Sequence, residues 1–234
     1  MDKPGVHTNG ILVYDPKNVP YGAIRLEPSE VFSLRLKTIK SWNKPLEVLP
    51  LKIGCEVAAV ATLFSSLFIT YRSRMFYNVF TKSGLSFSVI PCVLLPIAMA
   101  HQGFTHLVCK QILVGPSNSM SYPDCSVCLQ LRGAFISNVC GLVLPFGFSF
   151  IASAAAAVLT RSYPVPDLLD GKRMWKMFKL YSNSFRSVGP YLILGQTLFG
   201  TALVYAMIDS NQRLLEHQKL DRSVDLHNQE SVKD

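Results

Sequence analysis

Four long stretches of the chain are apolar, and polar or basic segments separate them. They cover residues about 53–71, 84–101, 133–160 and 187–208, and Glu56 is the one Asp, Glu, Lys or Arg that they contain. A helix rises roughly 1.5 Å per residue and the hydrocarbon core of a bilayer is about 30 Å thick, so about 20 apolar residues cross it. The pattern predicts an all-α membrane protein with four transmembrane helices.

The third stretch carries a small residue or proline at every fourth position: Gly133, Ser137, Gly141, Pro145, Ser149, Ser153 and Ala157. Lipid tails are as apolar as leucine, so helices in membranes associate mainly by close packing, which small residues spaced by four permit. We predict that this stretch is the spine against which the other spans pack. The expected helix-packing face consists of Gly133, Ser137, Gly141, Ser149 and Ser153.

The two ends of the chain differ from its middle. Residues 1–50 form an N-terminal arm that is rich in Pro and Gly, apart from a short amphipathic helix near residues 28–42 that either lies on the membrane surface or is an ordinary solvated helix. Residues 51–210 form the membrane domain. Residues 211–234 are a polar tail, which we expect to begin as a helix and to fray.

Composition and charge support a membrane protein. The chain of 234 residues is 49% hydrophobic and 16% charged, whereas soluble domains have about 25% charged residues. Its net charge of +8 comes from bases that lie between and beside the apolar stretches. A nucleic-acid-binding protein would instead carry a basic stripe on a recognisable fold. We therefore expect membrane lipid as a partner and no nucleic acid.

The basic residues also predict an orientation. The segments after the first and third stretches hold nine Lys and Arg, and the segment after the second holds two. The positive-inside rule then places the two segments that follow the first and third stretches on the cytoplasmic or matrix side, and both termini on the other side. In the second of these segments Trp175, Phe178 and Tyr181 interleave with lysines. Residues 172–186 are therefore expected to anchor the chain to acidic lipid or to a partner surface.

Catalytic motifs are absent from the sequence. It contains no Gly-x-Ser-x-Gly, phosphate-binding loop, dinucleotide fingerprint or His-Glu-x-x-His. Glu56 lies near one end of its stretch, where it can snorkel or pair with Lys52, and a buried proton-relay role is the alternative. We predict that the chain is not an enzyme and needs no cofactor.

The pair Cys125-Ser-Val-Cys128 has three interpretations. The cysteines could be structural, or they could form a disulfide and exchange it with other thiols. They could also join His106 and Cys109 in a zinc site, because two such pairs at this separation match zinc-ligand spacing. A single Cys-x-x-Cys without a redox fold is a weak signal, so all three interpretations stay open.

Several motifs in their order and spacing resemble the transmembrane protein 126 family. They are Leu67-Phe68 with Arg72 and Arg74, Ile90-Pro91, Asp124-Cys125-Ser-Val-Cys128, Arg132-Gly133, Gly141, Leu144-Pro145, Phe185-Arg186, Pro190 and Gln196-Thr197-Leu198-Phe199. The resemblance covers roughly residues 50–215. Where the family has a Gly-rich segment after the proline of the third span, this chain has Ala152–Ala157, which indicates a distant member.

The resemblance implies a multi-pass protein of the mitochondrial inner membrane that acts in the assembly of respiratory complex I. Its partners would then be complex I subunits and other assembly factors, and the family supplies no catalytic residues. We expect a scaffold or chaperone whose helix faces hold hydrophobic client subunits until their final neighbours arrive. The alternatives are a membrane thiol oxidoreductase that uses Cys125 and Cys128, and a small transporter.

Overall fold

The computed structural model of the protein describes residues 27–42, 46–79, 90–114, 125–161, 163–166 and 170–231. The predictions for residues 1–26, 84–89 and 115–124 lie outside these ranges. Within them, every regular element is a helix, and four helices are long and apolar enough to cross a membrane: Leu49–Phe76, Ile90–Val114, Ser126–Thr160 and Gly189–His217. The prediction of an all-α protein with four spans is confirmed.

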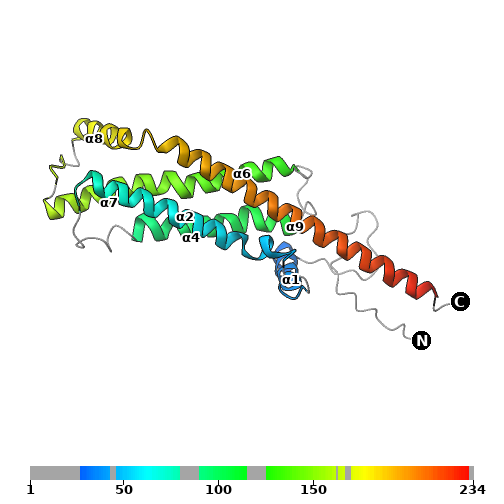
Figure 1. Ribbon diagram of the computed structural model, residues 1–234. Coiled ribbons are helices and arrows are strands. Elements are labelled where there is room, and N and C mark those ends of the chain that lie inside the picture. Colours follow the sequence, from blue (N-terminus) through cyan, green and yellow to red (C-terminus); the bar gives the residue numbers. More distant parts are fainter. Residues whose placement is uncertain are drawn as a thin grey trace.

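The helices form an elongated bundle (Figure 1). In chain order they are α1 (Pro28–Lys40), α2 (Leu49–Phe76), η1 (Ile90–Leu94), α4 (Leu95–Gly103), η2 (Phe104–Cys109), α5 (Lys110–Val114), α6 (Ser126–Asn138), η3 (Val139–Val143), α7 (Leu144–Thr160), α8 (Gly171–Ser184) and α9 (Gly189–Ser231). The short helix α1 lies at the end of the bundle near both termini, and α8 lies at the opposite end.

The second and third spans are interrupted by π-helical turns, which the sequence analysis did not predict. Pro91 lies within η1, and Pro145 is the second residue of α7, two positions after η3 ends at Val143. A proline has no N–H and its ring pushes away the carbonyl four residues earlier, so a wider turn accommodates it inside a continuous span. The helix that contains residues 133–160 begins at Ser126, and the helix of the second span continues to Val114.

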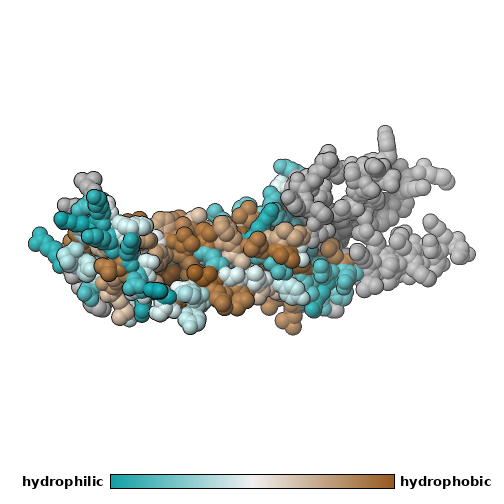
Figure 2. Space-filling model, turned by 90° about the horizontal axis from the view of Figure 1, so that it is seen from above, coloured by the Kyte–Doolittle hydropathy of each residue, from teal (hydrophilic) through white to brown (hydrophobic). Residues whose placement is uncertain are grey.

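Two levels of charged residues enclose the apolar part of the bundle. On α2, Lys52 and Arg72 are 20 positions apart, which corresponds to about 30 Å of helix and matches the thickness of a hydrocarbon core. Figure 2 shows the same division, with hydrophobic residues across the middle of the molecule and hydrophilic residues toward its ends.

Contacts between helices place the other charges at these two levels. Gly54 lies against Met207, two residues before Asp209 on α9, and Gly133, which follows Arg132, lies against Val204. At the other level, Thr70 and Ser73 of α2 contact Ser149 of α7. The residues of α7 beyond Ser149 therefore reach the level of Arg72 and extend past it.

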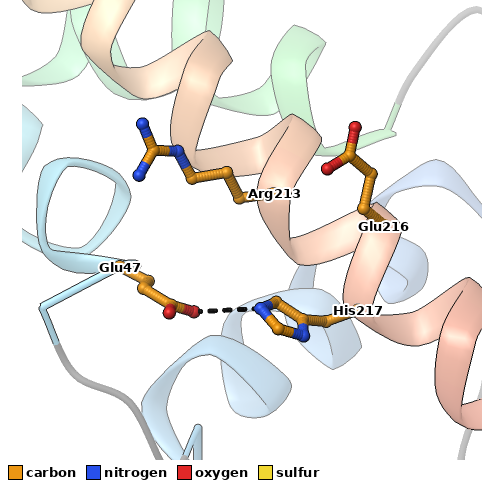
Figure 3. Close-up of a pocket in the computed structure, with 4 residues that line it drawn as sticks. All are labelled: Glu47, Arg213, Glu216 and His217. Atoms are coloured by element: carbon orange, nitrogen blue, oxygen red, sulfur yellow. Dashed lines mark ion pairs between the residues drawn. The ribbon is translucent and has the colours of Figure 1, made fainter.

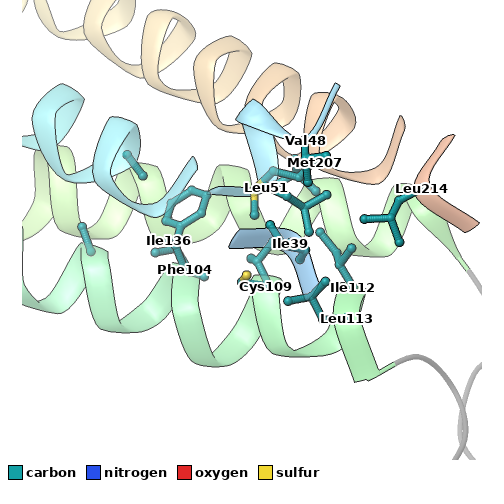
Figure 4. Close-up of a cluster of buried hydrophobic side chains, with 14 of the residues drawn as sticks. Ile39, Val48, Leu51, Phe104, Cys109, Ile112, Leu113, Ile136, Met207 and Leu214 are labelled. Carbon is teal, nitrogen blue, oxygen red and sulfur yellow. The ribbon is translucent and has the colours of Figure 1, made fainter. Parts of the chain in front are cut away.

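Two hydrophobic clusters hold the ends of the bundle. The first joins α1, the second span and α9 near the termini (Figure 4), and it includes Ile39, Leu51, Phe104, Leu113 and Met207. The second joins α2, α7 and α8 at the opposite end, and it includes Ile69, Tyr77, Phe150, Met177 and Tyr181. The clusters fix the two helices outside the spans, α1 and α8, onto the membrane domain.

Candidate functional site

The small-residue row of the third span faces this chain's own helices. At its start, α6 and α9 approach so closely that a Cβ added at Gly133 would overlap Val204 Cγ2. One turn later, the Ser137 hydroxyl donates a 2.6 Å hydrogen bond to Gln196 Oε1, and a Cβ at Gly141 would meet the same carboxamide at 3.0 Å. Small residues thus permit a close helix contact that a buried polar pair then fixes.

The second half of the row packs against α2. Thr70 Oγ1 and Ser149 Oγ lie 3.1 Å apart, and the Ser73 hydroxyl donates to the Ser149 carbonyl oxygen at 3.1 Å. Ser153 is also buried, and its hydroxyl has no hydrogen-bond partner among the described residues. All five predicted packing residues therefore lie inside the bundle, which agrees with the role of a spine. A surface for another protein has to lie elsewhere.

Other hydroxyls of α2 are satisfied within their own helix. Thr62 donates to the Ala58 carbonyl at 2.9 Å, and Ser66 donates to the Thr62 carbonyl at 2.7 Å. Ser and Thr in membrane helices commonly bond to the carbonyl one turn earlier, because lipid offers them no partner. These hydroxyls therefore satisfy their hydrogen bonds within α2 and serve the fold.

Glu56 pairs with a residue that the sequence did not indicate. His101 Nε2 of α4 lies 3.3 Å from Glu56 Oε1, whereas the sequence suggested Lys52 as the partner. Glu56 is four residues inside the level of Lys52, or about 6 Å from it along the helix. The pair lies at the boundary of the hydrocarbon and is partly exposed, which differs from a buried proton relay. No local pattern could have revealed it, because it depends on which two helices are neighbours.

The Cys-x-x-Cys motif lies at the beginning of α6. Cys125 is the N-cap, and its sulfur accepts a hydrogen bond from the Cys128 amide at 3.3 Å. Both thiols are exposed and free. The Cys128 thiol donates to the Cys125 sulfur and, with the amide, lowers the pKa of Cys125 below its usual value. Cys125 therefore has a larger thiolate fraction at neutral pH than an ordinary cysteine, and a Cys125–Cys128 disulfide stays one of the three interpretations.

The four residues of the zinc hypothesis have different surroundings. Cys109 is buried and its thiol contacts the Cys55 thiol of α2, whereas His106 is exposed. Within the described ranges, no three His, Cys, Asp or Glu side chains lie close enough together to hold a metal ion. His106, Cys109, Cys125 and Cys128 are thus not seen as one ligand set in this structure.

A pocket of about 250 Å³ lies near the termini and is lined by Glu47, Arg213, Glu216 and His217 (Figure 3). His217 Nε2 is 3.4 Å from Glu47 Oε2, and Arg213 pairs with Asp209 at 2.9 Å. Acidic and basic side chains face one another across this shallow site. The ion pair connects the segment before α2 to the extension of α9, which favours a structural role over ligand binding.

These contacts define a class of protein: a polytopic helical membrane protein whose described intramembrane polar groups bond within its helices or between them. Comparison with known sequences gives the family. The profile of the family "Transmembrane protein 126" matches residues 37–220, and the chain belongs to this family. The match confirms the resemblance drawn from the motifs.

A curated relative supports the assignment at a distance. Transmembrane protein 126 of Drosophila melanogaster is 23% identical over 205 residues, which cover 88% of this chain and 87% of the relative. The low identity over nearly full length agrees with a distant member of the family. No solved structure matches the chain.

Proposed function

We propose that this protein is a scaffold of the mitochondrial inner membrane that holds hydrophobic subunits of respiratory complex I during assembly. Its partners would be subunits of the membrane arm and other assembly factors, and it would need no catalytic residues or cofactor of its own. Membership of the transmembrane protein 126 family and the motifs described above support this proposal. The basic end of the bundle would face the matrix, and both termini would face the intermembrane space.

The observation that carries the proposal is the exposed face of α9. Its most apolar window is 17% buried by the rest of the chain, whereas the corresponding windows of the other spans are 39–44% buried. One side of α9 packs on α6 through Gln196, Gly200 and Val204. The other side exposes large apolar residues at helical spacing: Tyr191, Leu194, Leu198 and Tyr205.

The small-residue row cannot serve as the client-binding surface while it is packed inside the bundle. A stripe of large apolar side chains suits a temporary contact, because a client helix can exchange it for lipid or for another helix at little cost. We therefore assign client binding to this stripe, which we call the α9 outer face (Tyr191, Leu194, Leu198 and Tyr205).

Deletion of the chain tests the function. We expect cells without it to lose most of their assembled complex I on native gels and to accumulate smaller membrane-arm intermediates. The full-length chain should restore assembly, and so should a Val60→Ala/Phe64→Ala variant, which alters exposed apolar residues of α2. Leu194→Ala/Leu198→Ala should restore it poorly.

The outcomes separate two claims. Normal complex I levels after deletion would reject the proposed function. Loss of complex I with full rescue by Leu194→Ala/Leu198→Ala would keep the function but reject the α9 outer face as the site of contact.

A further inference from the structure

Helix α8 presents two different faces. Asp170 caps its N-terminus by accepting a hydrogen bond from the Arg173 amide at 3.3 Å. Met177 and Tyr181 point inward and are buried. Lys172, Trp175, Lys176 and Lys179 have the spacing i, i+3, i+4 and i+7, which places them together on the outer side of the helix, and all four are exposed. We call these four residues the α8 outer face.

The sequence predicted that all the aromatic residues of this segment lie at the membrane surface, but the structure divides them. The Tyr181 ring is 4.8 Å from Phe146 and 5.2 Å from Phe150 of α7, so it belongs to the core. Trp175 is 59% exposed. Its ring stacks on Phe178 at 5.6 Å, and Lys179 Nζ lies 5.9 Å from its centroid. The packing holds one aromatic ring outward among the lysines.

The contacts of α8 place it at headgroup level. Its Tyr181 packs against Phe146 and Phe150 of α7, which lie on either side of Ser149 in the sequence. Ser149 contacts Thr70 and Ser73 of α2, which flank Arg72. The α8 outer face therefore lies where the apolar part of α2 ends, within or just beyond the layer of lipid headgroups (Figure 1).

The charge at this level is strongly positive. Its described bases are Arg72, Arg74, Arg161, Lys172, Arg173, Lys176, Lys179 and Arg186, and Asp170 is the acid among the described residues there. Asp170 pairs with Arg173 at 3.1 Å. No carboxylate within the described ranges pairs with Lys172, Lys176 or Lys179, so their charges are available to a ligand.

We propose that the α8 outer face binds the headgroups of anionic phospholipids in the leaflet around it. Ammonium groups at headgroup level attract anionic lipid, and an exposed tryptophan is the side chain that favours this interface. An acidic protein segment would match the charges alone. The level of α8 and the outward Trp175 favour lipid. The proposal concerns the membrane itself and is independent of any role in complex I assembly.

Trp175 is a built-in reporter, since the chain has two tryptophans and Trp42→Phe removes the other. The full chain would be placed in nanodiscs of phosphatidylcholine with one-fifth phosphatidylglycerol, with bromine on the upper acyl chain of one lipid or the other. We expect each mole of brominated phosphatidylglycerol to quench Trp175 at least about fivefold more than a mole of brominated phosphatidylcholine does. Each base near an anionic surface contributes roughly this factor to the binding of anionic lipid. The preference should fall when salt is raised to about 0.5 M.

Charge variants provide the second arm. Lys172→Gln/Lys176→Gln/Lys179→Gln should bring the quenching ratio close to one. Arg35→Gln/Lys37→Gln/Lys40→Gln, which removes as many bases from α1 at the other end of the bundle, should leave it unchanged. In the protein that keeps Lys172, Lys176 and Lys179, a quenching ratio near one would overturn the proposal. A lipid preference that does not respond to salt would overturn it as well. Displacement of phosphatidylglycerol by a soluble polyglutamate peptide at equal charge would also overturn it and indicate an acidic protein partner.

Discussion

Tyr181→Ala is expected to lower the free energy of unfolding by about 3–5 kcal/mol, the usual cost of deleting a buried aromatic side chain. Tyr181 is fully buried, and its ring lies 4.8–5.6 Å from the rings of Phe146, Phe185, Phe150 and Phe76. The cavity would separate α8 from α2 and α7. A thermal melt in detergent should show a decrease of roughly 10 °C, and limited proteolysis should cleave near α8 first.

Two matched variants serve as controls for Tyr181→Ala. Tyr71→Ala removes the same side chain from an exposed position of α2, 64% accessible, and should change the melting temperature by less than about 3 °C. Tyr181→Phe keeps the ring and loses a hydrogen bond to the Phe146 carbonyl that is long, at 3.5 Å, so it should behave almost like the wild type. A melt of Tyr181→Ala that coincides with that of Tyr71→Ala would contradict the proposed core.

Gly200→Leu should be the second most damaging change, because it separates α6 from α9. A Cβ at Gly200 would lie 2.9 Å from Ala134 Cα and 2.9 Å from the Gly133 carbonyl oxygen. These are backbone atoms that cannot rotate away, so the helices must move apart and break the hydrogen bonds Ser137–Gln196 and Asn138–Thr197. We expect a loss of about 3 kcal/mol and a melting temperature lower by roughly 6–12 °C.

Gly195→Leu is the control for this variant. It makes the same substitution five residues earlier in α9, where a Cβ would meet no heavy atom within 4 Å. Both variants gain the same helix propensity, since Leu is a better helix former than Gly. The difference between the two melts therefore measures the contact with α6. Equal stability of the two variants would show that α6 and α9 are not in close contact.

The sequence predicted the features that depend on local pattern. The lengths of the apolar stretches define four spans, and the repeat from Gly133 to Ser153 identifies the spine, because both follow from helix geometry and hydropathy alone. The alternation of bases and apolar residues near residue 175 also favoured a helix, and the structure has α8 there; its place at the membrane surface stays a prediction. The family resemblance rested on motif order and was confirmed over residues 37–220.

The features that sequence reasoning missed depend on which helices are neighbours. The sequence marked Gln196 only as part of a family motif and gave it no structural role, but its side chain fills the space that Gly141 leaves and accepts a hydrogen bond from the Ser137 hydroxyl. His101 of the second span pairs with Glu56 of the first span. Trp175 and Tyr181 are six residues apart, so helix geometry alone places them on different sides of α8. Which of the two sides packs against α7 depends on tertiary contacts, and these bury Tyr181.

Site-specific photocrosslinking tests the central claim most directly, namely that the α9 outer face receives a helix of a complex I subunit. A photoreactive amino acid would replace Leu198 on this face or Phe64 on the exposed side of α2, in cells that assemble complex I. We predict that Leu198 forms an adduct with a membrane-arm subunit, identified by mass spectrometry, and that Phe64 labels lipid. Equal labelling from both positions, or lipid adducts alone from Leu198, would contradict the claim.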